Sequence, residues 1–427
     1  QTRYQDERSK IGKGDDAALK ALDKKFSKET DQLAERKRLE MKLEYEYNVN
    51  ITNAADRTWS LEDLQRMQAL FEKLPPEHMK QNAGVKEIRR ERVRTDAGVE
   101  KPRIGGDHLG PKVNVFDTGL TSNYRYTGAE SKLGEHEKGK DAPKDELSRL
   151  EEVLVHEIGH GVHDQNWATF VKFKAAVGWE DKDKAGIKAA LQAAGKTAAQ
   201  ADTFIQDLDD NRSKNYTEQP EKIYKGKVYI IDPYNDAGYL IRDLGAMPST
   251  QDTGVDASTT AEYGYARSNA KDHFAEVYMQ LAEVPEEAYK NLVATPTARY
   301  EGKRETAATL TAAHDALSKD PKATKLAIGK AKRAMDTAVA EATSAKASMD
   351  AHVAQWTIMR NEVYHTDTAE GASLTAVTAA ANAIPEAVKK AKALGSVAEF
   401  KKSVVQCGTP HQVKRLEERT LAAIKAL

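Results

Sequence analysis

The stretch Glu151-Glu152-Val153-Leu154-Val155-His156-Glu157-Ile158-Gly159-His160 decides the fold of this 427-residue chain. Its two histidines are four residues apart, and a helix of about 3.6 residues per turn places such a pair on one face, one turn apart. The apolar residues around them recur at intervals of three and four: Leu150, Val153, Leu154 and Ile158. This periodicity predicts an amphipathic helix with the histidines beside its buried stripe.

The His-Glu-x-x-His pattern is typical of zinc peptidases, in which both imidazoles bind the metal and the glutamate activates a water. The alternative is a surface helix that carries two histidines by chance, with Glu157 as a solvated charge. A catalytic zinc needs a third protein ligand. One class takes a histidine six residues after the second, but Asn166 stands there. His163 lies two turns from His156, too far to share the ion, and we interpret it as structural or as a support for a ligand.

The third ligand is therefore expected on a later helix, within residues 263–279. Asp272 and Glu276 are four residues apart, so both lie on one helix face. One carboxylate can bind zinc while the other accepts a hydrogen bond from a ligating histidine. The buried side of this helix is formed by Phe274, Val277, Tyr278 and Leu281. An ordinary amphipathic helix with exposed acids is the alternative that the spacing leaves open.

Together, these residues and Tyr265 resemble the catalytic domain of anthrax lethal factor and the related Pro-Pro endopeptidases. In that family a tyrosine precedes the third zinc ligand by seven residues and an acid follows it by four; Tyr265, Asp272 and Glu276 reproduce both intervals. The family ligand is glutamate, whereas this chain has an aspartate that is one methylene shorter. Either the helix lies closer to the metal or Glu276 replaces Asp272. We favour Asp272 as ligand and Glu276 as its support.

The resemblance covers about residues 55–290, including a helix at 59–76 that begins with a capping-box-like Ser60 and Asp63. It implies an α+β fold of the zincin-like type, with a small mixed sheet and active-site helices. It also implies bound Zn²⁺, Glu157 as the catalytic base, and Tyr265 as a donor to the oxyanion. A packed aromatic is the alternative for Tyr265. The 112 residues from His160 to Asp272 (272 − 160) exceed the family's spacing, so we expect an insertion at about 165–260.

Composition predicts three domains. Residues 1–40 form a charged helical segment, 41–300 the zinc metallopeptidase domain with its insertion, and 301–427 an all-α domain rich in Ala and Lys. We expect the chain up to about residue 300 to fold and bind zinc without the rest. The helical domain could serve delivery, partner binding or oligomerisation, and the sequence does not choose among these.

Local patterns add further expectations. Residues 41–52 alternate between apolar and polar side chains, which predicts a half-buried strand. Glycines at 103–110 predict a connection, as does the glycine-rich region 128–139, and 233–254 is expected to be rich in loops. Helices are expected in the C-terminal region, interrupted near Gly371, Pro385 and Gly408-Thr409-Pro410.

The balance of charge gives no sign of a nucleic-acid partner. Charged residues make up 31% of the chain and the net charge is −1, with Lys and Arg mixed among Asp and Glu. The single cysteine, Cys407, excludes an intramolecular disulfide, and no apolar run approaches the 18 residues of a membrane span. No signal peptide is visible, although the first residue is Gln. We expect a soluble protein and leave secretion or injection as an effector open.

The sequence thus predicts a zinc-dependent endopeptidase that hydrolyses peptide bonds with a metal-activated water, with a toxin or effector protease as one role. Its partner would be a protein or peptide substrate, and the C-terminal helices could engage a delivery or binding partner. The alternative is a non-catalytic helical scaffold whose peptidase-like domain serves for docking. Bound zinc with turnover would distinguish the first function from the second.

Overall fold

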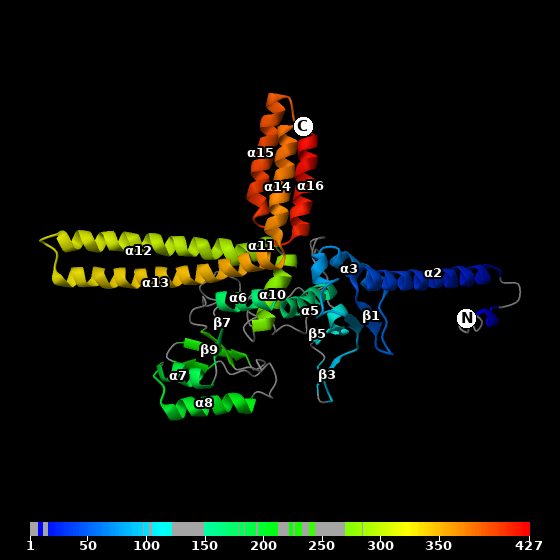
Figure 1. Ribbon diagram of the computed structural model, residues 1–427, viewed down its shortest axis with the longest axis horizontal. Coiled ribbons are helices and arrows are strands. Elements are labelled where there is room, and N and C mark those ends of the chain that lie inside the picture. The colour runs from blue at the N-terminus through cyan, green and yellow to red at the C-terminus, as the bar shows by residue number, and fades with distance from the viewer. Residues whose placement is uncertain are drawn as a thin grey trace. The chain divides into compact units, whose positions relative to one another are not determined.

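The structure is a computed structural model in which helices predominate and short strands form small sheets, in agreement with the expected α+β class (Figure 1). It describes residues 7–11, 16–96, 98–101, 105–121, 149–177, 179–182, 184–193, 195–211, 222–224, 227–232, 239–243, 270–283 and 285–427. The chain divides into two compact units. Unit 1 comprises Gln1–Ser122 and Arg149–Gly161, and unit 2 comprises Asn123–Ser148 and Val162–Leu427.

Unit 1 contains a four-stranded mixed sheet of order β1-β2-β6-β5. Strands β1 (Asn50–Asn53), β2 (Glu87–Arg90) and β6 (Lys112–Val115) are parallel, whereas β5 (Gly106–Leu109) is antiparallel to β6. A separate hairpin pairs β3 (Arg94–Asp96) with β4 (Val99–Lys101).

The two faces of this sheet differ in polarity. Ile51, Ile88 and Val113 are paired across β1, β2 and β6, and all three are buried. One residue further along, Thr52, Arg89 and Asn114 are paired on the opposite face. Because side chains alternate across a strand, the register gives the sheet one apolar face that packs in the core of unit 1 and one polar face.

The strand predicted at residues 41–52 is wrong for most of its length. Helix α2 runs from Asp16 to Tyr47, and only β1 is extended. Leu39, Leu43 and Tyr47 are buried at a spacing of four. The intervening Met41 and Tyr45 are 58% and 91% exposed. When every second residue is apolar, every fourth residue is apolar too, so the same sequence can form the buried stripe of a helix. Contacts with α3, such as that of Tyr47 with Phe71, favour the helix here.

Helix α3 (Leu61–Phe71) confirms the predicted start. Ser60 accepts a hydrogen bond from the Asp63 amide, and the Asp63 side chain accepts one from the Ser60 amide. This reciprocal capping box satisfies two amides that the first turn leaves without helical partners. The α-helix ends at Phe71, five residues short of the expected end at residue 76, and a 3₁₀ turn, η1, follows at Pro76–His78.

The glycine-rich segment 103–110 was expected to be a connection, but β5 occupies four of its residues. Leu109 pairs with Lys112, which leaves Gly110-Pro111 as a two-residue hairpin loop. Gly110 has φ +60°, a conformation that side chains with a Cβ atom rarely adopt. The glycine therefore serves the turn, while the residues before it add the edge strand. The region 128–139 lies outside the described residues.

Unit 2 contains an antiparallel sheet of order β7-β10-β9-β8. Its strands are β7 (Trp179–Lys182), β8 (Lys222–Tyr224), β9 (Lys227–Asp232) and β10 (Tyr239–Asp243). Strand β10 lies within 233–254, which was expected to be rich in loops; the other residues of that segment lie outside the described residues. Helices α6, α7 and α8 span Trp167–Ala176, Lys184–Ala193 and Ala198–Asn211.

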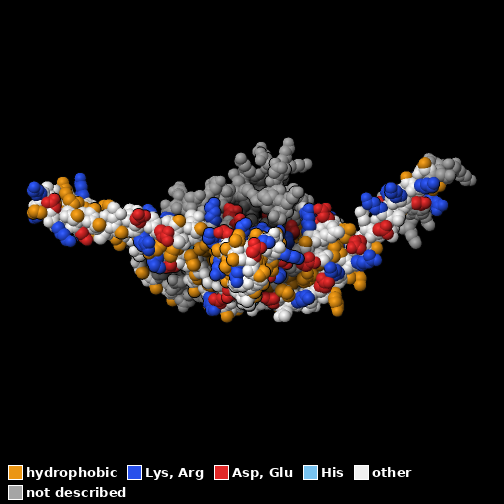
Figure 2. Space-filling model, turned by 90° about the horizontal axis from the view of Figure 1, so that it is seen from above, with side chains coloured by type: hydrophobic (Ala, Val, Ile, Leu, Met, Phe, Trp, Pro, Cys, Tyr) orange, Lys and Arg blue, Asp and Glu red, His pale blue; other side chains and the backbone are white. Residues whose placement is uncertain are grey.

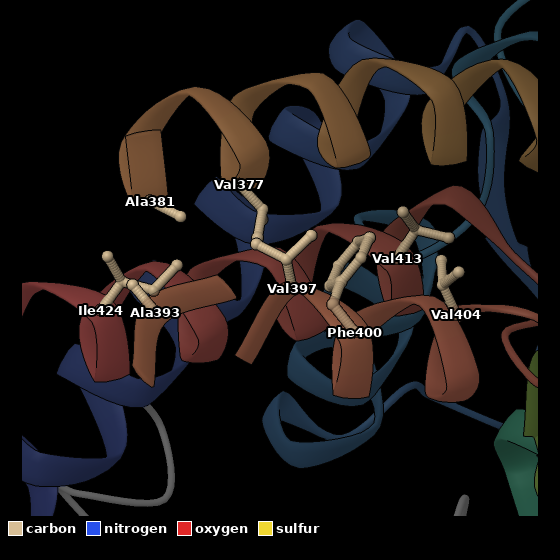
Figure 3. Close-up of a cluster of buried hydrophobic side chains, with 8 residues drawn as sticks. All are labelled: Val377, Ala381, Ala393, Val397, Phe400, Val404, Val413 and Ile424. Atoms are coloured by element: carbon tan, nitrogen blue, oxygen red, sulfur yellow. The ribbon is translucent and has the colours of Figure 1, made fainter. Parts of the chain in front are cut away.

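The described residues of unit 2 from Ala270 onward are mainly helical (Figure 1). They form α10 (Ala270–Glu283), α11 (Pro285–Tyr289), the π-helix η6 (Lys290–Ala294), α12 (Thr295–Lys319), α13 (Lys325–Thr357), the π-helix η7 (Ile358–Val363), α14 (Thr366–Asn382), α15 (Ala387–Val404) and α16 (Pro410–Lys425). The chain breaks near Pro385 and Gly408, as predicted. Gly371 does not interrupt a helix but lies within α14. Helices α14, α15 and α16 share a core that includes Val377, Val397 and Phe400 (Figure 3).

Residue 300, the expected domain boundary, lies within α12. Helix α10 precedes it, yet side chains from beyond it bond to α10, as described below. The division into three domains stays a prediction. Within the described ranges, no helix has both the length and the apolar composition needed to cross a membrane. Lys and Arg side chains are interspersed with Asp and Glu on the face drawn in Figure 2.

The helical assignment of residues 41–47 can be tested by two substitutions. We expect Leu43→Ala to lower the free energy of unfolding by about 2–5 kcal/mol, because Leu43 is fully buried. Met41→Ala should change it by less than about 0.5 kcal/mol, because that side chain is exposed. Denaturant titration of both variants measures this. Equal losses at the two positions would contradict the buried helical stripe.

Candidate metal centre

Helix α5 (Arg149–Gln165) carries the His-Glu-x-x-His residues. Leu154, Val155 and Ile158 are fully buried, and they fix which face of the helix enters the core. His156 and Glu157 are also buried, whereas His160 is partly exposed. The rings of the two histidines lie 4.9 Å apart between centroids. The predicted placement of both imidazoles on one helix face is therefore present.

Strand β5 approaches α5 closely at Gly106. A Cβ atom there would lie 2.4 Å from Val153 Cγ1, 3.0 Å from the Asn114 carbonyl oxygen and 3.4 Å from Glu157 Cγ. The first distance is shorter than any real contact of this kind, so glycine is required at this position. This contact places the edge strand of the sheet against the helix beside Glu157.

His108 lies two residues further along β5, on the same face as Gly106. Its ring is stacked on that of His160, with 6.0 Å between the centroids. Its Nε2 lies 2.7 Å from the Gly84 carbonyl oxygen. Gly84 in turn packs on Gly161, because a Cβ atom at Gly84 would lie 2.7 Å from the Gly161 Cα. Loop 82–86, β5 and the second half of α5 thus pack around the His160 ring.

His163 has the structural position that its spacing predicted. It is buried, its ring stacks on Phe170 at 5.0 Å, and it meets Phe274 of α10 edge-on at 5.9 Å. These contacts fasten the last turn of α5 to α6 and α10. They also explain why a histidine can be buried there, because its ring packs as an aromatic.

Helix α10 presents the acidic residues. Asp272 and Glu276 are only 3% and 4% exposed, which contradicts the alternative of solvated acids on an amphipathic helix. Phe274, Val277, Tyr278 and Leu281 are buried as expected. The helix is therefore enclosed on all sides. Burial of carboxylates is costly unless cations or hydrogen-bond donors compensate for it.

One group of side chains in the described part of the chain could hold a metal: His156, His160 and Asp272. Each offers one donor atom, and these atoms lie within 4.8 Å of one another. Helix α5 belongs to both units, since its residues to Gly161 fall in unit 1 and those from Val162 in unit 2. The last turn of α5 packs on α10 through His163 and Phe274.

The donor set fits zinc. Two imidazole nitrogens and one carboxylate oxygen form the usual protein ligand set of a catalytic zinc site, which leaves a fourth position for water. The group includes Asp272 and not Glu276, in line with the preference for Asp272 as the third ligand. Glu157 is adjacent to His156 and is not a member of the group. Tyr265 lies outside the described residues.

Several residues at this site were not found from the sequence. Gly106 and His108 fall in the segment interpreted as a glycine-rich connection, although the Gly-Pro pair that follows them was a signal for a hairpin. His273 and its partner Gln355 are separated by 82 residues, so no local pattern indicates that they meet.

Comparisons with family models, with curated proteins and with solved structures found no match to this chain.

The close approach at Gly106 predicts a steric penalty. Gly106→Ala should lower the free energy of unfolding by about 1–3 kcal/mol, because the new methyl group overlaps Val153. Thermal unfolding measures the loss, and adding Val153→Ala should restore part of it. Gly302→Ala is the matched control: open space surrounds Gly302 in α12, so this change should stabilise by about 0.5–1 kcal/mol. A neutral Gly106→Ala would refute the contact.

Proposed function

We propose that this protein is a zinc-dependent endopeptidase with a zincin-like fold. The observation that carries this proposal is the grouping of His156, His160 and Asp272, with Glu157 between the two histidines on the same helix. A mixed sheet whose antiparallel edge strand packs on that helix supports the fold assignment. A role as a toxin or effector rests on the sequence resemblance.

Zinc bound by these three side chains would polarise a scissile carbonyl and lower the pKa of a water to about 7. Glu157 is the base in this scheme. Its carboxylate accepts a proton from the attacking water and later donates it to the leaving amine. Strand β5 passes beside this side chain, because a Cβ atom built at Gly106 would lie 3.4 Å from Glu157 Cγ. From the resemblance, Tyr265 would donate a hydrogen bond to the developing oxyanion.

Strand β5 supports a peptide as the substrate. It is the last strand in the order β1-β2-β6-β5, and within the described residues only β6 pairs with it. An edge strand offers backbone amides and carbonyls that an extended peptide can pair with as an added strand. Because β5 contacts α5 beside Glu157, such a peptide would run past the proposed base. A small-molecule substrate would need no such edge.

The proposal is tested by Glu157→Gln together with the zinc content. The wild type should hold about one zinc per chain and cleave members of a peptide library. Glu157→Gln should keep the zinc and the fold, because Glu157 is not a ligand, while turnover falls by about a thousandfold or more. His156→Ala is the matched control and should lose the zinc. Normal cleavage by Glu157→Gln, or a zinc-free wild type, would refute this function and favour the non-catalytic scaffold.

The third ligand is tested by comparing the two buried acids of α10. Asp272→Ala should abolish stoichiometric zinc binding, because it removes one of three protein ligands. Glu276→Ala should weaken it only about 10- to 100-fold, the usual effect of losing a side chain that supports a ligand. Competition with a zinc chelator measures both affinities. If Glu276→Ala has the larger effect, Glu276 is the ligand and the assignment of Asp272 fails.

A further inference from the structure

The back of helix α10 is held by side chains that come from the C-terminal helices. Asp272 lies in the first turn of this helix and His273 follows it, with both side chains buried. The Nε2 atom of His273 lies 3.1 Å from Oε1 of Gln355 on α13. Since an amide oxygen only accepts, His273 donates this bond. The His273 ring also meets Phe173 of α6 edge-to-face, with 5.1 Å between the ring centroids.

Two more contacts fix the remainder of the helix. The Tyr364 hydroxyl donates to the Tyr278 carbonyl oxygen at 2.9 Å, and the two rings stack 4.7 Å apart. Burial raises the pKa of the Tyr364 phenol well above its usual range, so this group stays protonated and remains a donor. At the end of α10, Gln412 Nε2 donates to the Leu281 and Ala282 carbonyl oxygens at 3.0 and 3.2 Å.

The carbonyls of Leu281 and Ala282 belong to the last turn of α10, where a helix leaves its acceptors without helical partners. Gln412 satisfies them from α16, and its own oxygen accepts from the amides of Gly408 and Thr409. Gly408 also packs directly on α10, because a Cβ atom there would lie 2.6 Å from the Leu281 carbonyl oxygen. The end of α10 and the start of α16 are thus joined through one side chain.

Burial along α13 shows which part of this helix lies near the His273–Gln355 hydrogen bond. In the first part of α13 only Ala338 and Ala345 are buried, whereas Ser348, His352, Gln355 and Trp356 near its end are all buried. Gln355 is 2% exposed and His273 is 2% exposed, so their hydrogen bond is shielded from water. A polar pair enclosed in this way has few alternative partners, and it therefore specifies one rotation of α10.

We infer that Gln355, through His273, positions Asp272 for metal binding, and that the C-terminal helices are part of the metal centre's support. The inference rests on the proposed function, because it assigns Asp272 as a zinc ligand. Adjacent residues on a helix project about 100° apart. Holding the His273 ring by contacts with Phe173 and Gln355 therefore fixes the direction in which Asp272 projects. Gln355 is a positioning residue that acts through another side chain.

The test compares three full-length variants. Gln355→Leu keeps the approximate volume but removes the acceptor, and zinc affinity should fall about 10- to 100-fold. Gln355→Glu keeps an acceptor oxygen and should stay within about threefold of the wild type. Val397→Ala, in the separate core of α14, α15 and α16, should lower the melting temperature and leave zinc affinity unchanged. Absorption spectra of the Co²⁺-loaded protein should change for Gln355→Leu alone.

Unchanged zinc affinity in Gln355→Leu, or an equal loss in Val397→Ala, would overturn the inference while leaving the proposed function intact. If the wild type binds no zinc, the proposed function fails, and hydrogen exchange of the α10 amides then decides whether Gln355 positions this helix. Faster exchange in Gln355→Leu but not in Val397→Ala supports the positioning of α10 by Gln355, and equal exchange in the two variants overturns it. Should Gln355→Leu fail to fold, Tyr364→Phe removes the hydroxyl that donates to the Tyr278 carbonyl oxygen of α10, and it should lower zinc affinity at least about threefold. No change in Tyr364→Phe would count against the inference.

Discussion

The packing of helix α5 is the constraint on which the rest of the structure depends. Four of its apolar residues are fully buried: Leu154, Val155, Ile158 and Val162. The residues of this helix up to Gly161 belong to unit 1 and the later ones to unit 2. A helix enclosed in this way cannot rotate about its axis. The face that carries His156 and His160 is therefore fixed by packing before any metal is considered. Glycines at 106 and 161 allow backbone to approach this helix more closely than any larger residue would permit.

Carboxylates are buried on the packed helices α5 and α10. Glu157, Asp272 and Glu276 are each at least nine-tenths buried, on helices α5 and α10. Carboxylates in such positions need cations or hydrogen-bond donors, and a bound divalent ion would be the largest charge in the neighbourhood. By contrast, the Asp117 carboxylate of unit 1 is bound by Arg57 and Arg90. Burial alone would raise its pKa, but these two guanidinium groups lower it below the usual range, which is the signature of a structural ion pair.

The C-terminal helices change the interpretation of the domain organisation. Their Ala- and Lys-rich composition suggested an appended module, and the core shared by α14, α15 and α16 could hold these three helices together (Figure 3). Gln355, Tyr364 and Gln412 nevertheless bond to α10, which precedes them in the chain. A chain ending near residue 300 would lose the contacts that Tyr364 makes with Tyr278 and that Gly408 and Gln412 make with Leu281. The expectation that such a chain folds and binds zinc is therefore not supported by the packing.

The sequence by itself determined the elements whose signals are local. The spacing of His156 and His160, the Ser60–Asp63 capping box, the buried stripe of α10 and the breaks near Pro385 and Gly408 all depend on residues within one or two turns of each other. Only the tertiary structure decided between helix and strand for residues 41–47. Apolar residues at every second position fit a strand, and every second one of them also fits a helical stripe; packing on α3 favours the helix. It alone placed His108 beside His160 and Gln355 beside His273. These pairs are distant in the chain, and contacts of that kind arise from the packing of whole elements, which leaves no periodic trace in the sequence.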